Sequence, residues 1–269
     1  MAEIKSSTAK SDLFKRYGVR IFVICFWLLF WEILYRVIDN EIFLVSPLTV
    51  ASTLRKLAVQ AAFWQAIGFS FLRIALGFLS AVAAGTILAV LSYKSGVVRE
   101  LINPVFKVIK ASPVASFIIL ALLWIKAGNL SVLISFLMVV PMTYTNVLQG
   151  ILATDWKLLE MAHVFHLSKW KQIKAIYLPA VMPYFSSAVT VGLGFSWKAG
   201  IAAEVIGIPS GSIGERLYEA KLYLMTGELF AWTFVIIVIS ILFEKIVIYL
   251  IKHIRLNTVN DKTKNIRVS

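Results

Sequence analysis

Cysteine, histidine and charge are all scarce in this chain, and each shortage removes a class of function. The 269 residues include 1 cysteine and 3 histidines, and 15% of them are charged. Because Cys25 stands alone, an intrachain disulfide is excluded, and we expect a buried structural thiol. No Cys/His cluster has the spacing of metal ligands, so we expect no metal site.

Catalytic motifs are missing as well. The chain has no G-x-x-x-x-G-K-[ST] segment, so it cannot hold a nucleoside triphosphate on a phosphate-binding loop of its own. His163, His166 and His253 lie outside the apolar runs, where they cannot act as the base of a buried serine hydrolase. We therefore expect no catalytic residue and no cofactor. An intramembrane enzyme and a structural subunit of another membrane complex remain as alternatives.

Apolar residues dominate what is present. The chain is 59% hydrophobic with a mean hydropathy of +0.83, whereas about a quarter of an ordinary soluble domain is charged. Residues 74–93, 127–154 and 175–197 contain no charged side chain, and about 20 apolar residues suffice to cross a bilayer. We predict an all-α integral membrane protein in the lipid bilayer. Its six transmembrane helices are expected at residues 20–38, 67–93, 103–125, 130–152, 180–206 and 229–251.

The basic residues predict the orientation of these helices. Lys and Arg are concentrated in the N-terminal tail, the loop around residue 96, the 153–179 loop and the C-terminal tail. Short loops rich in Lys and Arg stay in the cytoplasm, so both termini and the 153–179 loop are predicted to be cytoplasmic. The net charge of +13 is spread over these separate loops, which disfavours a nucleic-acid partner.

Three segments follow from this reading. Residues 1–62 hold the N-terminal tail, the first transmembrane helix and an outside interfacial helix that starts at Ser46-Pro47. Residues 63–251 form the membrane core with its 153–179 loop. Residues 252–269 form a cytoplasmic tail.

The 153–179 loop predicts a helix, a break and a second helix. Thr154 and Asp155 are good N-cap candidates for the first helix. Ser168 can begin a second helix, from 169 to 177, which Pro179 helps to end. An exposed apolar face on such a loop indicates a docked partner.

Small and polar residues mark the faces of the predicted spans. Gly77, Ala81 and Gly85 recur every four residues, which favours close helix packing. Polar or small residues also follow one face of the fourth and fifth spans, as a candidate translocation pathway or as hydrogen bonds in a closed core: Thr145, Asn146, Gln149, Ser187, Thr190, Gly194 and Lys198. Lys198 is expected to be functional because charge at membrane depth is costly. A structural link from Lys198 to Glu204 is the alternative.

One motif in the loop is specific. Glu160, Met161, Ala162, His166, Ile176, Leu178 and Pro179 resemble the E-A-A-x3-G-x9-I-x-L-P signature of ABC importer membrane subunits. In that family the loop is the coupling helix that docks on the ATPase. Met161 replaces an alanine and His166 replaces the glycine. Glycine suits a left-handed backbone there, and His tolerates that conformation better than most residues.

Further segments are similar to the sulfonate, taurine and nitrate branch of these permeases, which also includes thiamine-precursor transporters. They are Ser46-Pro47, Ser70 to Arg73 leading to Gly77-Phe78, and Trp197 through Ala203-Glu204 to Gly207. The resemblance implies the type I ABC importer permease fold in a prokaryotic inner or plasma membrane. It also implies two ATPase subunits, an extracytoplasmic solute-binding protein and a second permease subunit, often identical. The solute is not identified by these motifs.

Overall fold

The computed structural model describes the backbone of residues 2–266, with side chains from 18 to 251 and at 253. This part of the chain contains helices and no strand. The predicted tail extends beyond it, because residues 267–269 lie outside the described residues. The elements are α1 Ala2–Ile38, α2 Pro47–Ala58, α3 Ala61–Lys94, α4 Gly96–Ala111, α5 Val114–Ala121, α6 Ala127–Leu152, α7 Trp156–Val164, α8 Lys169–Gln172, a π-helical turn η1 Ile173–Tyr177, α9 Leu178–Gly207, α10 Ile213–Leu222 and α11 Thr226–Ile266.

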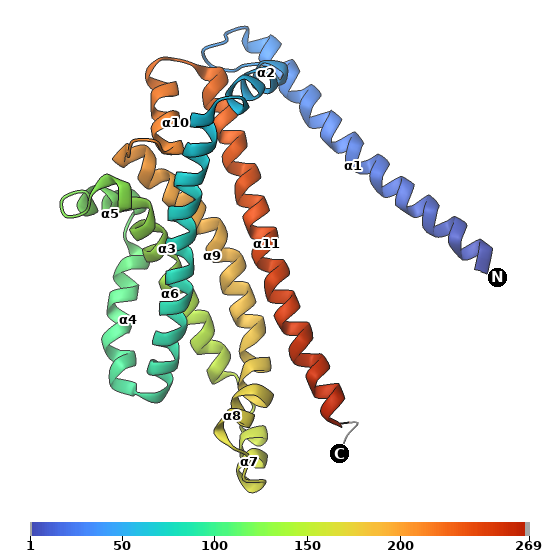
Figure 1. Ribbon diagram of the computed structural model, residues 1–269, viewed down its shortest axis with the longest axis vertical. Helices are drawn as coiled ribbons and strands as arrows, with labels where there is room; N and C mark the ends of the chain where they lie inside the picture. Colours follow the sequence, from blue (N-terminus) through green and yellow to red (C-terminus); the bar gives the residue numbers. More distant parts are fainter. Residues whose placement is uncertain (1, 267–269) are drawn as a thin grey trace.

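Three long helices form the centre of the structure. In Figure 1, α3, α6 and α9 run along the long axis, and α6 packs extensively against both of the others. The short helices α2 and α10 lie at one end, and α7 and α8 lie at the other. The pair α4 and α5 covers one side, and α11 runs along the opposite side (Figure 1).

Close packing between α3 and α6 depends on small residues. A Cβ atom at Gly77 would overlap the carbonyl oxygen of Val132, and one at Gly85 would lie 2.8 Å from Thr143 Cβ. Ala81, between the two glycines, is fully buried. The predicted packing role of these three small residues is therefore confirmed.

Helix α9 also packs closely against α3 and α6 at a small residue. A Cβ at Gly200 would lie 2.6 Å from Ile74 Cγ1 and 2.7 Å from Ser135 Oγ. The Ser135 hydroxyl donates a hydrogen bond of 3.0 Å to the carbonyl of Ser196. Three helices thus meet at one level, where any added side-chain volume would push them apart.

The third predicted span is wrong as a continuous helix. Five described helices are long and apolar enough to cross a membrane, or six if α4 and α5 count as one span, but this pair is bent by 104°. The bend lies at Ser112, which has an extended backbone (φ −82°, ψ 139°), and at Pro113. Proline disfavours helical geometry in the residue before it, so a run of apolar residues at 103–125 folds as two helices.

The first helix leaves the bundle. In Figure 1, α1 diverges from the other helices, and none of its apolar window, Gly18–Ile38, is buried. Its attachment lies near its end, where Trp31 Nε1 donates to the carbonyl of Val45 at 3.0 Å and its ring lies against Phe230. Cys25 is exposed on this helix, so the expected burial of the thiol is wrong for the single chain.

Two capped helices lie at the α2–α10 end. Ser46 accepts a hydrogen bond from the Thr49 amide at 3.1 Å, so the predicted helix start at Ser46-Pro47 is confirmed. Helix α10 was not predicted from the sequence. Ser212 accepts from the Glu215 amide at 2.9 Å, and this S-x-x-E pattern is a capping-box signal that the sequence carried.

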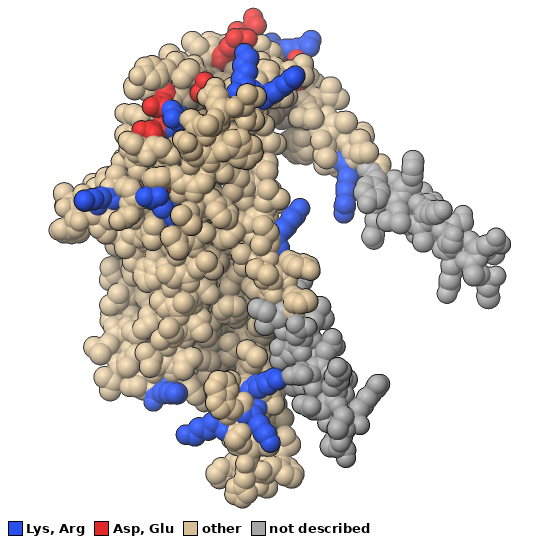
Figure 2. Space-filling model, in the orientation of Figure 1, with Lys and Arg blue, Asp and Glu red and all other residues tan. Residues whose placement is uncertain are grey.

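Charge differs between the two ends. On the face shown in Figure 2, the end with α7 and α8 shows Lys and Arg only, whereas acidic residues gather at the α2–α10 end. Lys and Arg are visible at the α2–α10 end as well, so the two ends differ on this face in their acidic residues (Figure 2).

Candidate functional site

The 153–179 loop begins with a capped helix. Asp155 accepts a hydrogen bond from the Lys157 amide at 2.9 Å and is the N-cap of α7. The Thr154 hydroxyl is buried and makes no hydrogen bond within the described part of the chain. Of the two predicted caps, Asp155 is therefore the one that starts the helix.

The break after α7 is a Schellman turn. His166 has a left-handed backbone with φ 49°, as expected for the position that holds glycine in the family signature. The Leu167 amide donates to the carbonyl of Ala162 at 2.9 Å, and the His166 amide donates to the carbonyl of His163 at 3.0 Å. These two bonds satisfy the last carbonyls of α7, so the turn forms without glycine.

The signature residues divide into two groups. Ala162 and Ile176 are buried, with 0% and 6% of their surface exposed. The other five are exposed: Glu160, Met161, His166, Leu178 and Pro179. Ala162 therefore packs inside the loop, and the exposed signature residues are accessible to another protein.

Pro179 does not end the second helix, contrary to the prediction. Helix α8 runs through η1 into α9, and Pro179 lies in the first turn of α9. The Leu178 amide bonds to the carbonyl of Ile173, five residues back. A proline is tolerated in a first helical turn, and the wider π turn allows the chain to continue as helix.

The loop exposes large apolar side chains. We call the following residues the apolar loop surface: Trp156, Met161, Val164, Phe165 and Trp170, each of them 47% to 81% exposed. Exposed apolar patches are typical of surfaces that contact another protein or the membrane.

The polar face of α6 is partly open. Thr145 and Asn146 are half-buried and Gln149 is exposed. Thr145 Oγ1 donates to the Pro141 carbonyl at 2.7 Å, and Asn146 Nδ2 donates to the Met142 carbonyl at 2.9 Å, so both groups bond within their own helix.

Lys110 joins this face from another helix. Its Nζ atom donates to Thr145 Oγ1 at 2.9 Å, from α4 to α6. The sequence reasoning missed Lys110, although a lysine inside the predicted third span was a visible signal.

The polar face of α9 lies on the outside of the single chain. Ser187 and Lys198 are exposed, Gly194 borders open space, and Thr190 Oγ1 donates to its own helix at the Ser186 carbonyl. The opposite face of α9, with Trp197, packs into the bundle. The structure therefore does not enclose these side chains in a core shared with the α6 face.

Glu204 has partners other than Lys198. Its carboxyl group is fully buried, and Oε2 accepts hydrogen bonds from Ser70 Oγ at 2.6 Å and from the Gly214 amide at 3.3 Å. Lys198 makes no ion pair with Glu204, and six residues along a helix place the two side chains on different faces. The alternative of a Lys198–Glu204 link is thus wrong for the described chain.

The comparison with known families decides the identity of the fold. The profile of the family described as "Binding-protein-dependent transport system inner membrane component" matches residues 81–256. The chain belongs to this family. The recognition of an ABC importer membrane subunit from the loop signature is therefore confirmed.

Individual proteins that are similar to this permease are also ABC transporter permeases. TauC of Escherichia coli (strain K12), a taurine transport system permease protein, is 24% identical over 220 residues, which cover 80% of each chain. SsuC of Bacillus subtilis (strain 168), a permease assigned to aliphatic sulfonate transport, is 27% identical over 205 residues, covering 76% of this chain and 74% of SsuC.

A solved structure shares the fold. A bacterial ABC transporter involved in the import of the acidic polysaccharide alginate superimposes with a TM-score of 0.56 at 14% identity, over 91% of this permease and 96% of that chain. This permease is thus a multi-pass, non-enzymatic membrane subunit of an ATP-driven importer, and ATP hydrolysis resides on a separate partner.

Proposed function

We propose that this permease imports a small anion across a prokaryotic inner or plasma membrane. It works as a homodimer with two ATPase subunits and an extracytoplasmic solute-binding protein. The observation that carries the proposal is the family membership together with relatives named for taurine, aliphatic sulfonate, nitrate and bicarbonate transport. Each of these solutes is a small polar molecule with an anionic group, and taurine carries an ammonium group as well.

The apolar loop surface is proposed as the ATPase contact. Phe165 and Trp170 are 71% and 81% exposed, and Glu160 adds a carboxylate on the same loop. Buried Ala162 and the Schellman turn at His166 hold the loop in one shape, so that a push on α7 is transmitted and not absorbed. ATP-driven closure of the ATPase pair then moves α8 and α9 together.

The pathway is proposed to lie between two copies of the chain. In a single copy the polar face of α9 is exposed and the apolar window of α1 is unburied. A second copy would cover both. The α9 residues Ser187, Thr190, Gly194 and Lys198 and the α6 residues Thr145, Asn146 and Gln149 would then line the route, and Lys198 would attract the anion.

The ATPase contact is tested by co-purification from cells that express both subunits. Phe165→Asp should abolish recovery of the ATPase with the permease, because it places a charge in the apolar loop surface. The matched control is Leu224→Asp, since Leu224 is 65% exposed at the opposite end. Equal ATPase recovery with both variants would refute the assignment.

The orientation is tested by cysteine labelling in a Cys25→Ser background. A cysteine at 166 should be shielded from an impermeant external reagent. One at 223 should react, because Tyr223 is 67% exposed at the α10 end. Labelling of position 166 from outside would overturn the proposed topology.

A further inference from the structure

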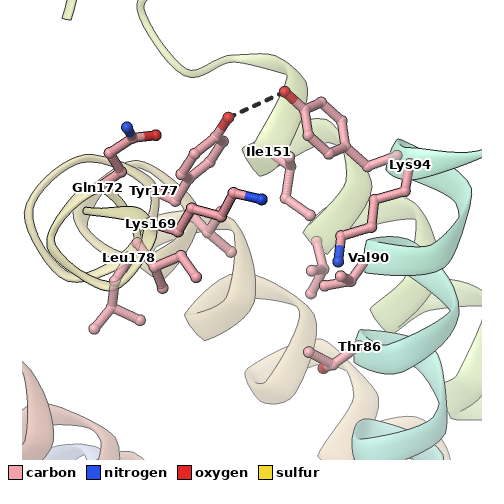
Figure 3. A pocket seen from close by; sticks show the side chains of 12 residues that line it. Thr86, Val90, Lys94, Ile151, Lys169, Gln172, Tyr177 and Leu178 are labelled. Atoms are coloured by element: carbon pink, nitrogen blue, oxygen red, sulfur yellow. Dashed lines mark hydrogen bonds between the residues drawn. The ribbon is translucent and has the colours of Figure 1, made fainter. Parts of the chain in front are cut away.

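A pocket lies at the end of the bundle where the loop joins the long helices. Its volume is about 590 Å³, and it is bordered by the last turns of α3 and α6, by α8 and η1, and by the start of α9 (Figure 3). The hydroxyl groups of Tyr93 on α3 and Tyr177 on η1 are 3.1 Å apart, and their rings meet edge to face. This tyrosine pair connects the loop to α3 across the pocket.

The wall of the pocket is mostly hydrocarbon. Val90 on α3, Val147 and Ile151 on α6, and Leu178 and Val181 on α9 line it. Val90 and Leu178 are each 38% exposed. A small hydrated anion would leave this wall in contact with water, whereas an acyl chain would cover it.

The polar part of the lining is cationic. Lys94 and Lys169 contribute to it, and no Asp or Glu does. In Figure 3 both side chains extend toward the space between α3 and the loop. Neither lysine forms an ion pair with a carboxylate in the described part of the chain, so both charges are available to an anion.

The pocket also sits at the depth of a lipid headgroup. Helices α3 and α6 are long and apolar enough to span a membrane and end at Lys94 and Leu152, which places the pocket where hydrocarbon would meet water. In the proposed orientation it faces the cytoplasmic leaflet, where anionic lipids concentrate and basic pockets between helices bind their headgroups.

We propose that this pocket binds an anionic phospholipid of the cytoplasmic leaflet. Its phosphate lies between Lys94 and Lys169, and an acyl chain lies against Val90, Ile151 and Leu178. The leaflet depends on the orientation proposed above. Because the lipid would contact both α3 and the loop segment that leads into α9, it would stabilise the junction between the coupling loop and the pathway helix.

The test measures lipid retention by the purified full-length permease with native mass spectrometry. The probes are phosphatidylglycerol and phosphatidylcholine with identical chains. Wild type should retain phosphatidylglycerol in preference. The double variant Lys94→Gln/Lys169→Gln should weaken that retention by about fivefold for each charge removed, roughly 25-fold in all, with phosphatidylcholine unchanged.

A matched control is available on the same loop. Lys157→Gln/Lys171→Gln removes the same charge from residues that do not line the pocket, and it should leave retention unchanged. Val90→Trp, which fills the pocket from an exposed position, should lower retention of both lipids. Each variant must elute as wild type does on size exclusion.

Several outcomes would overturn the proposal. They are equal loss in the two double variants, equal retention of the two lipids by wild type, or displacement of the lipid by millimolar glycerol phosphate, which would indicate a site for small anions. The readout involves neither ATPase nor solute, so failure of the proposed transport function would leave it intact. Labelling of residue 166 from outside would refute the assignment to the cytoplasmic leaflet but not the binding of the lipid.

Discussion

The buried carboxyl group of Glu204 offers the sharpest test of how the α10 end is held together. Glu204 Oε2 accepts hydrogen bonds from the Ser70 hydroxyl and the Gly214 amide, and Ser70 Oγ accepts in turn from the Ile213 amide at 2.9 Å. One carboxyl group thus connects α9 to α3 and to the start of α10. Removing it should loosen α10 from the bundle.

The size of the effect follows from these contacts. Glu204→Ala leaves two buried donors without an acceptor, and each costs about 1–3 kcal/mol, so a loss of roughly 4 kcal/mol in the free energy of unfolding is expected. Glu204→Gln keeps one oxygen for both donors. The amide nitrogen of Gln would replace Oε1, an oxygen that has no hydrogen-bond partner in the described chain. The Ser131 hydroxyl, which also lacks a partner, lies near this side chain. The expected loss for Gln is below about 1 kcal/mol.

The assay is unfolding by sodium dodecyl sulfate in mixed micelles, with hydrogen exchange of the α10 amides as a local readout. Glu219→Ala serves as the control, because Glu219 lies on α10 in a part-exposed ion pair with Arg216 that contributes about 0–1 kcal/mol. If Glu204→Gln proves as damaging as Glu204→Ala, the charge matters and the hydrogen-bond reasoning is refuted.

The remaining predictions concern packing, the loop turn and the pathway. Gly77→Ala should cost at least about 2 kcal/mol of unfolding free energy, whereas Gly68→Ala, on the same helix with open space around it, should cost nothing; equal effects in the unfolding assay would contradict the packing account. His166→Gly should slow hydrogen exchange of the Leu167 amide by about fivefold, since glycine adopts a left-handed backbone without cost, and faster exchange would contradict this. Lys198→Met should slow uptake of an anionic solute by about tenfold, with Lys198→Arg less harmful and capture by the binding protein unchanged; unchanged uptake would remove Lys198 from the pathway.

Much of the fold could be predicted because helices that span a membrane appear in the sequence as long runs of apolar residues. The predicted spans at 67–93 and 130–152 fall within α3 and α6, which extend a few residues further. The span at 103–125 is not one continuous helix, because apolar composition does not distinguish a straight helix from two helices bent at Pro113. Only the local effect of proline on Ser112 could have indicated the break.

In the 153–179 loop the family signature predicted one backbone feature correctly, and a general rule about proline predicted another wrongly. The signature placed a left-handed residue at His166, and the structure has φ 49° there. Pro179 was read as a helix end because proline usually breaks helices, but the π turn before it leaves the helix continuous. The continuity of the helix depends on a hydrogen bond between residues five apart, and no local sequence pattern predicts such a bond.

Partners distant in sequence were the hardest to predict. Glu204 and Lys198 are close in the chain, so a link between them was a natural hypothesis. The partner observed is Ser70, 134 residues away. Buried polar groups take whichever donor the tertiary packing provides, and sequence spacing within one helix cannot reveal it.

The unbroken helix from Lys169 to Gly207 has a mechanical consequence. Its 39 residues extend over about 58 Å at 1.5 Å per residue, from the loop beside α7 to the buried carboxyl group near its far end. A rod of that length amplifies small angles: a tilt of about 5° at one end displaces the other by roughly 5 Å. A rotation of the whole helix at Lys169 therefore becomes a displacement of several ångströms at Gly207, whereas flexing at the π turn Ile173–Tyr177 would reduce that displacement.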